Sequence, residues 1–374
     1  MKKTLIALAV TAMVSTAASA TVIFQKEGTK IDLDGRVHFE LRNDANNRTD
    51  LRDVGSRVRV RAYQELGAGF SAYGGVELRF SNDNGDANAI GSNFRTHRLY
   101  AGLIQKDVGT LTFGSQLHLG DHIPKANYTY DWGSNILFDG HKKAAHFMSA
   151  KFAGVRFATD YYFGQANKAN NKSSGTTAWN EGQGYGVGLF YDNTFGDFGV
   201  RFGAGYTTVT QSSDGTKANE FKLKRSGVGL ELKYNIVRVG FDWAHGKVSK
   251  SGQESGNLGF QKIAGGLDLG KDKDGKAIKL SLNKIDRFLL GVKVDVTEQN
   301  AIYGQYYFAK GKKADASLAP LKMRGWMIGA DHRFNKNFAV YVEGGQGRVK
   351  QAGKVLNKNE KTNHRVLVGA RMLF

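Results

Sequence analysis

The most regularly spaced ionisable side chains in this sequence are arginines that alternate with apolar residues. In the segment 57–62, every odd position is arginine and every even position is valine or alanine. A period of two places the two sets on opposite faces of a β-strand. The candidate residues that share this polar phase are Arg36, Arg57, Arg59, Arg61, Arg79 and Arg98. Fixed guanidinium groups can attract anions and orient polar solutes, but they carry out no bond-making step, so the sequence predicts a basic wall that faces water.

The remaining candidates predict no reaction chemistry. His118 and His122 have the spacing of two metal ligands on a helix, but Pro124 follows and no acidic residue stands in the motif position. The histidines His38, His97, His141 and His146 show no spacing typical of a catalytic triad or a metal site. We therefore expect no catalytic residue, no metal ion and no cofactor.

The segment Ile31–Arg42 shows the kind of element that must position the arginines. Its odd positions are apolar apart from Gly35, and its even positions are polar throughout. A tilted strand of about 9–11 such residues is long enough to cross a membrane. The alternation recurs and predicts about sixteen strands. They lie near Ile31–Arg42, Arg57–Ala62, Phe70–Phe80, Arg98–Leu103, Gly109–Leu117, Lys143–Phe152, Val155–Phe163, Tyr185–Tyr191, Phe198–Tyr206, Val228–Tyr234, Val237–Trp243, Phe288–Val296, Ile302–Phe308, Arg324–Arg333, Phe338–Gly344 and His364–Phe374.

The connections between these strands fall into two length classes. Short links are expected at Leu66–Gly69, Gln105–Gly109, Asn193–Asp197, Asp295–Asn300 and Arg333–Asn337. Long polar loops are expected at Asn43–Val54, Ser81–Phe94, Gly164–Gly184, Thr207–Lys222, Ser249–Lys284, Lys310–Lys322 and Arg348–Asn363. Short periplasmic turns and long extracellular loops are typical of transmembrane β-barrels. We predict an all-β, antiparallel transmembrane barrel over residues 21–374, without a domain boundary.

The N-terminal end predicts export. Residues 1–20 combine Lys2 and Lys3 with the apolar run Leu5–Val14 and the small residues Ala18–Ala20, as in a cleaved signal peptide. No later stretch has eighteen consecutive apolar residues, so no transmembrane helix is predicted. The sequence contains no cysteine, which excludes a disulfide-stapled secreted scaffold.

The formal net charge of +19 would suggest nucleic-acid binding in a soluble protein. In this chain the basic residues alternate with lipid-type residues or lie in polar loops, so no nucleic-acid partner is predicted. The loop lysines Lys271, Lys273 and Lys276 either contact anionic lipopolysaccharide or are solvated loop tips.

Four segments carry a family resemblance: Lys26–Arg36, Gly55–Val58, Arg98–Leu103 and the final Gly369–Phe374. They resemble the trimeric general porins of Gram-negative bacteria, most closely the outer-membrane protein P2 and H-type porins of the Pasteurellaceae. The resemblance implies a sixteen-strand barrel, a homotrimer in the outer membrane, and a third long loop that folds into the lumen. It also implies that Gly369, Arg371 and Phe374 form the signal through which the last strand engages the barrel-assembly machinery.

The resemblance places the third loop at His118–Lys142, although the family's Pro-Glu-Phe-Gly-Gly motif is absent. Asp121, Asp131 and Asp139 are the candidates for its acidic side. Arg36, Arg57 and Arg98 match the family's basic wall best, and Lys143 is a further candidate. Charges on facing walls create a field that orients dipolar solutes and biases ion flow.

These expectations predict a general diffusion porin, a water-filled channel for small hydrophilic solutes with a weak preference for anions. The alternation is also compatible with a substrate-specific channel, which the lack of an aromatic track on the inward phases disfavours. A barrel adhesin or an outer-membrane hydrolase would show the same strand pattern. A TonB-linked transporter is excluded, because its barrel needs about 22 strands and a plug.

Overall fold

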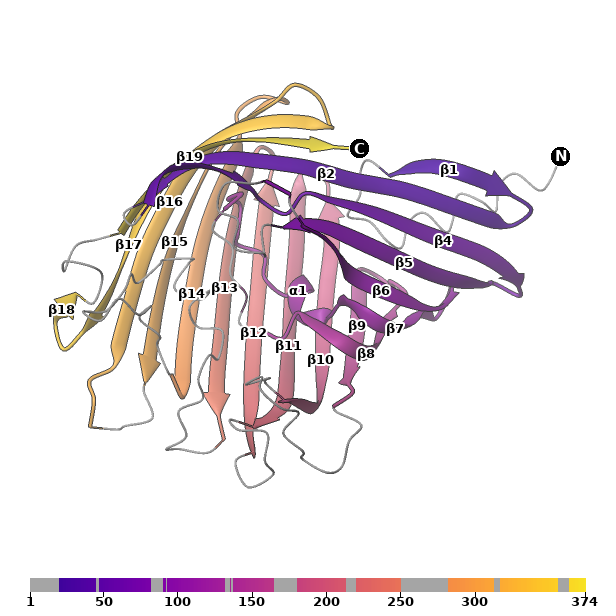
Figure 1. Ribbon diagram of the computed structural model, residues 1–374, viewed down its shortest axis with the longest axis horizontal. Coiled ribbons are helices and arrows are strands. Elements are labelled where there is room, and N and C mark those ends of the chain that lie inside the picture. The colour runs from indigo at the N-terminus through magenta and orange to yellow at the C-terminus, as the bar shows by residue number, and fades with distance from the viewer. Residues whose placement is uncertain are drawn as a thin grey trace.

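The chain forms one antiparallel sheet that closes on itself, as the computed structural model shows (Figure 1). The structure describes residues 20–44, 47–81, 90–91, 93–131, 135, 137–164, 180–212, 220–249, 282–312, 317–355 and 363–374. The elements are β1 (Thr21–Lys26), β2 (Thr29–Asp44), β3 (Asn47–Asp53), β4 (Arg57–Gly67), β5 (Phe70–Ser81), β6 (Asn93–Gln105), β7 (Gly109–Leu117), α1 (Leu119–His122), β8 (Gly140–Ser149), β9 (Val155–Tyr162), β10 (Asn180–Phe195), β11 (Phe198–Ser212), β12 (Glu220–Tyr234), β13 (Val237–Val248), β14 (Lys284–Asp295), β15 (Asn300–Lys312), β16 (Leu321–Arg333), β17 (Phe338–Gln351), β18 (Lys354–Val355) and β19 (Asn363–Leu373).

Three of these strands, β1, β3 and β18, do not add a strand of their own to the barrel wall. β3 and β4 pair with different halves of β2 and together make one broken wall strand. β1 pairs with the first half of β2, beyond the point where β19 ends, so it continues the line of β19. β18 pairs only with the end of β17. The barrel in the described residues therefore has sixteen strands, which confirms the predicted fold.

Period-two alternation places apolar side chains outside and polar side chains inside. On β2, His38 and Glu40 are buried in the interior, whereas Leu41 is 51% exposed on the outer face. Leu99 on β6 and Ile328 on β16 are 61% and 59% exposed in the same way. An outer band of this kind suits the hydrocarbon of a bilayer.

Barrel closure depends on a glycine opposite the C-terminal residue. The Gly35 N–H donates to the Phe374 carbonyl at 2.8 Å, and the Phe374 N–H donates to the Gly35 carbonyl at 3.2 Å. A Cβ at position 35 would lie 2.3 Å from the Phe374 ring, so only glycine leaves room for it. Phe374 therefore seals the junction between β2 and the last strand.

The long-loop predictions at two places are wrong. Most of Asn43–Val54 is strand, because β3 continues the hydrogen-bonded ladder along β2. Much of Thr207–Lys222 is also strand, because β11 runs to Ser212 and β12 begins at Glu220. Polar side chains on both phases, such as Thr207, Thr208 and Thr210 on β11, hide the alternation by which a strand is recognised in the sequence. Residues 250–281, including Lys271, Lys273 and Lys276, lie outside the described residues.

The connections alternate between the two ends of the barrel. Tight turns such as Ala68-Gly69, where both residues have positive φ, join strands at one end. Strands that are separated by longer stretches of sequence adjoin at the other end of the barrel, as the end of β13 and the start of β14 do. Residues 118–139, between β7 and β8 and here called loop 3, carry the short helix α1 into the interior. No helix in the described ranges is long and apolar enough to span a membrane.

Candidate functional site

Loop 3 lies directly on the inner wall along a track of glycines on five neighbouring strands. The track consists of Gly186 and Gly188 on β10, Gly203 and Gly205 on β11, Gly227 and Gly229 on β12, Gly240 on β13 and Gly291 on β14. A Cβ at Gly229 would lie 2.1 Å from the Ile123 carbonyl oxygen, and one at Gly291 would lie 1.9 Å from that of Ala126. The loop backbone therefore occupies space that side chains fill elsewhere on the wall.

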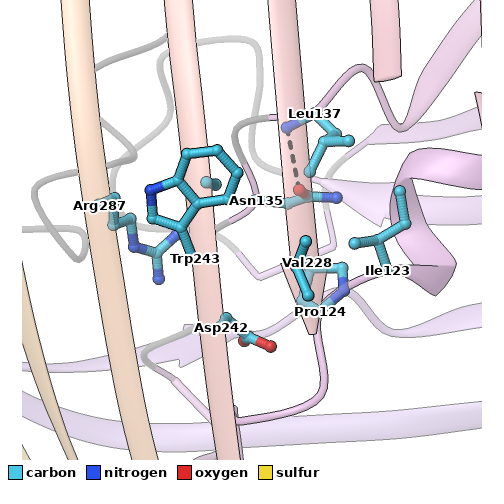
Figure 2. Close-up of a pocket in the computed structure, with 9 residues that line it drawn as sticks. Ile123, Pro124, Asn135, Leu137, Val228, Asp242, Trp243 and Arg287 are labelled. Atoms are coloured by element: carbon cyan, nitrogen blue, oxygen red, sulfur yellow. Dashed lines mark hydrogen bonds between the residues drawn. The ribbon is translucent and has the colours of Figure 1, made fainter. Parts of the chain in front are cut away.

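Apolar side chains of loop 3 complete this contact. Leu119, Ile123, Ala126 and Leu137 are at most 3% exposed. Figure 2 shows Ile123 and Leu137 beside β12 and β13, with Asp242 and Arg287 nearby on the wall. Asn135 accepts a hydrogen bond from the Leu137 N–H at 3.0 Å and so shapes the returning arm of the loop. Burial of these side chains favours the inward position of the loop over an open one.

Two wall carboxylates bind the backbone of loop 3. Asp242 on β13 accepts hydrogen bonds from the N–H groups of Lys125 at 2.6 Å and Ala126 at 3.1 Å. Glu343 on β17 accepts hydrogen bonds from the N–H groups of Tyr130 at 2.6 Å and Asp131 at 3.2 Å. Hydrogen bonds to charged acceptors are the stronger kind, each contributing about 1.5–3 kcal/mol. The loop is thus fixed at two points of the wall, on β13 and β17, which are four strands apart.

Asp131 is an anchor of loop 3. Its carboxylate accepts hydrogen bonds from Arg42 on β2 at 2.9 Å and from Arg365 on β19 at 2.5 Å. The Asp131 side chain is only 9% exposed. Both carboxylate oxygens are occupied by partners other than the predicted basic wall, so Asp131 is not a free acidic group that faces Arg57 or Arg98.

The predicted arginines form two groups. Arg57, Arg79 and Arg98 surround Glu77 at 3.3, 2.6 and 2.8 Å. Arg36 lies on the same inward phase and donates to the carbonyl oxygens of Gly55 at 3.1 Å and Val54 at 2.8 Å. We call Arg36, Arg57, Arg79 and Arg98 the arginine wall.

The second group is further along the strands and is neutralised locally. Arg59 and Arg61 both bind Asp34 at 2.8 Å, and Arg61 is only 3% exposed. These two arginines on β4 thereby link this strand to β2 through ion pairs with Asp34. They contribute less net charge to the lumen than the arginine wall, where three guanidinium groups share one carboxylate.

The two remaining acidic candidates on loop 3 face water. Asp121 on α1 and Asp139 at the end of loop 3 both have exposed side chains. The protein groups packed around Asp121 and the nearby Asp139 carboxylate raise the pKa of Asp121, even though its side chain is exposed. The positive charges of Arg98 and Arg57 act in the opposite direction and lower this pKa. Asp121 is thus within electrostatic range of Arg57 and Arg98 in the arginine wall.

Lys143 does not belong to the wall, and its prediction is wrong. β8 begins at Gly140, and its inward phase is set by Ala144 and His146, which are buried. Lys143 precedes Ala144 and therefore points outward, where its side chain is exposed and donates to the Gly164 carbonyl at 3.0 Å.

Part of the inner lining is apolar, which the sequence pattern did not predict. Ile285, Leu289, Tyr307, Met323 and Met327 lie on inward phases of β14 to β16 and are at most 2% exposed. This cluster lies on the side of the barrel away from the arginine wall. The inward face of these strands is mixed, because Arg287, Lys293 and Asp331 share it with the apolar cluster.

A model of the Gram-negative porin family matches residues 4–352. The chain belongs to the Gram-negative porin family. This porin is 34% identical to the major outer membrane protein of Pasteurella multocida strain Pm70, over the full length of both chains.

Solved porins share its fold at low sequence identity. The structure matches OmpF of Salmonella typhi with a TM-score of 0.66 and 16% identity, over 94% of this chain and 99% of that one. It matches the anion-selective porin of Comamonas acidovorans with a TM-score of 0.61 and 18% identity, over 92% and 100% of the two chains. The family and its outer-membrane relatives show that this porin is an outer-membrane channel of the general diffusion type.

Several functional residues of the porin were not singled out from its sequence. Glu77, Asp242 and Glu343 are inward carboxylates, and each lies on the polar phase of its strand. Glycines that recur on the inward phase of five successive strands were a second available signal. Both signals become interpretable only when the inward phase is assigned strand by strand.

Proposed function

We propose that solutes cross this porin through a constriction between the arginine wall and the Asp121–Asp139 side of loop 3. The observation that carries the proposal is the unequal charge of the wall, where four guanidinium groups accompany one carboxylate, Glu77. Opposed charges across a narrow passage orient dipolar solutes and disfavour apolar ones.

The same balance supports a weak preference for anions. Glu77 offsets part of the positive charge of the arginine wall, and Asp121 and Asp139 offset more from across the passage. The residual charge is small and positive, so chloride is favoured modestly over potassium. We infer that these charges serve the passage of solutes and ions rather than a catalytic step.

Planar-bilayer recording tests this proposal directly. Single-channel conductance and the reversal potential across a KCl gradient are measured for the wild type and for the Arg57→Ser/Arg98→Ser double variant. We expect a larger conductance and a reversal potential displaced toward cations in the variant. The matched control is Arg238→Ser, because Arg238 pairs with Asp295 at 2.9 Å on strands distant from the arginine wall. Equal displacement in both variants would refute the assigned location, and absence of conductance from folded protein would favour an adhesin or a hydrolase.

We also propose that three copies assemble in the outer membrane. The support is the apolar outer face of the barrel and the trimer form described for OmpT of Vibrio cholerae, which this chain matches with a TM-score of 0.62 at 14% identity. Conductance that closes in three equal steps is the expected result. A single closing step, together with a monomer mass by light scattering in detergent, would refute the trimer.

Export and assembly complete the proposal. Residues 1–20 act as a cleaved signal peptide, which N-terminal sequencing of the outer-membrane protein tests; residues 1–19 lie outside the described residues. Gly369, Arg371 and Phe374 act as the signal for the barrel-assembly machinery. Gly369 leaves room for the Tyr341 ring, since a Cβ there would lie 2.2 Å from it, and Arg371 lies 4.6 Å from the Tyr130 ring centroid. Lipopolysaccharide is the proposed partner of the loop ends.

A further inference from the structure

Two histidines and an aspartate meet where loop 3 leaves the wall. His118 is the first residue of loop 3, His146 lies on β8 and Asp160 lies on β9. One potential ligand atom from each of these residues lies within 4.8 Å of the others. The Asp160 Oδ1 atom is 2.5 Å from His146 Nδ1 and 3.5 Å from His118 Nδ1. The three side chains converge on one point inside the barrel.

The carboxylate of Asp160 is held in a fixed orientation. Its Oδ2 atom accepts hydrogen bonds from the Leu119 N–H at 3.1 Å and the Tyr162 hydroxyl at 3.0 Å. Oδ1 is thereby turned toward the two imidazoles. In metal sites, a ligating carboxylate is regularly held in place by hydrogen bonds to its other oxygen atom.

His118 is the second, independent indication. Its side chain is 0% exposed; Nε2 has no hydrogen-bond partner among the described residues, and Nδ1 makes only the long 3.5 Å contact with Asp160 Oδ1. The imidazole packs edge-on against Tyr162, with ring centroids 5.3 Å apart, and faces His146 and Asp160. Burial of an imidazole without a hydrogen bond is unfavourable unless another partner, such as a cation, satisfies one of its nitrogens.

We infer that His118, His146 and Asp160 bind a divalent transition-metal ion of the zinc class at the root of loop 3. Imidazole nitrogen with carboxylate oxygen is a ligand set that Zn²⁺ accepts, whereas Ca²⁺ and Mg²⁺ prefer oxygen alone. Bonds of about 2.0–2.1 Å in a tetrahedron place ligand atoms about 3.3 Å apart. The 3.5 Å separation of Asp160 and His118 is close to this, and His146 needs to move outward by less than about 1 Å.

Three protein ligands leave one tetrahedral position for water. The ion would join loop 3 to two wall strands at the point where the loop turns inward. This function goes beyond passage of solutes, since it concerns how the constriction is held in place. The set also differs from the His118–His122 spacing in the sequence, because its other two ligands come from β8 and β9.

Metal binding by the refolded full chain tests the inference. The protein is prepared without a histidine tag, treated with a chelator, and titrated in detergent with Co²⁺ as a spectroscopic probe and with Zn²⁺ by calorimetry. We expect one ion per chain, the intense visible absorption of tetrahedral Co²⁺, and displacement of Co²⁺ by Zn²⁺. His118→Gln and His146→Gln should each weaken binding by at least about a hundredfold.

The control is His245→Gln. His245 pairs with Asp286 at 2.7 Å, so this variant removes a histidine–aspartate pair that is not part of the cluster. Tyr162→Phe keeps all three ligands, removes one hydrogen bond to Asp160, and should weaken binding by about tenfold. Heat-modifiable migration in gels verifies that each variant is folded. No stoichiometric binding to the wild type, or equal binding to folded His118→Gln and the wild type, would overturn the inference.

Discussion

The ring of Tyr130 in loop 3 lies parallel to the ring of Tyr341 on β17, with centroids 4.0 Å apart and planes 6° from parallel. Loop 3 leaves the wall at β7, so this stack shows that its tip reaches the far side of the barrel. Arg371 on the last strand covers the Tyr130 ring, and the Tyr130 hydroxyl donates to Asp331 at 3.2 Å. The tip of the loop is therefore held by β16, β17 and the last strand, β19.

Tyr130→Ala should loosen this tip. The variant removes the stack, which contributes about 0.5–1.5 kcal/mol, and the contact with Arg371, while the backbone hydrogen bonds to Glu343 stay. We expect larger open-channel current fluctuations and a higher mean conductance. Tyr185→Ala on the outer face of β10, where Tyr185 is 52% exposed, is the control and should record like the wild type. Identical noise in both variants would mean that the stack does not hold the loop.

Glu77→Gln should make the channel more selective for anions. The substitution removes the one carboxylate that neutralises Arg57, Arg79 and Arg98. The Glu77 side chain is 1% exposed, and loss of one member of a buried ionic cluster costs about 3–5 kcal/mol, so the yield of heat-resistant folded protein should also fall. The reversal potential across a KCl gradient measures the first effect. Glu65→Gln, at an exposed position near the β4–β5 turn, is the control. A displacement toward cations would contradict the charge assignment.

Gly291→Val should displace loop 3 from the wall. Its Cβ would lie 1.9 Å from the Ala126 carbonyl oxygen, and backbone cannot yield as a side chain can. We expect altered conductance and faster proteolysis within loop 3 in a barrel that still folds. Gly304→Val on β15 is the matched control, because its nearest neighbour would be a side-chain methyl of Ile328 at 3.3 Å. Loss of the loop phenotype in Gly291→Val, or its appearance in Gly304→Val, would count against the glycine track.

Selectivity should change with pH through Asp121. Burial and the Asp139 carboxylate raise the pKa of Asp121, so its negative charge is lost at a higher pH than that of an ordinary aspartate as the solution is acidified. Loss of this charge leaves the arginine wall less opposed, and the preference for anions should increase. The reversal potential of the wild type is measured over a pH series beside Asp121→Asn, which should start more anion-selective and lack this step. Asp197→Asn, in the exposed β10–β11 turn, should titrate like the wild type. A step that survives in Asp121→Asn would assign the titration elsewhere.

The membrane-spanning strands could be predicted because one face of each strand meets lipid. Ile31–Arg42 shows the alternation clearly, and β2 covers that whole segment. β3 could not be recognised in the same way, because Leu51 is its only apolar residue and a single residue shows no alternation. Its position is fixed by the ladder to β2, which has no signature in the sequence pattern.

The constriction could be predicted only in part, because residues that contact one another there are distant in sequence. The inward phase of Arg57 and Arg98 follows from their own strands. The role of Asp131 depends on Arg42 and Arg365, which are 89 and 234 residues away. An acidic residue in a loop gives no indication whether it faces the passage or is paired with the wall.

The glycine track allows the width and charge of the passage to change independently of the barrel wall. Five adjacent strands carry glycine in place of larger side chains beneath loop 3. The loop therefore acts as an insert laid against the inner wall, and the barrel itself is not narrowed. The water column is eccentric and runs between a permanent arginine-bearing surface and the free edge of this insert. Substitutions at the free edge can widen, narrow or recharge the passage and leave the hydrogen-bonded ladder intact. Permeability and membrane integrity are thereby encoded in separate sets of residues.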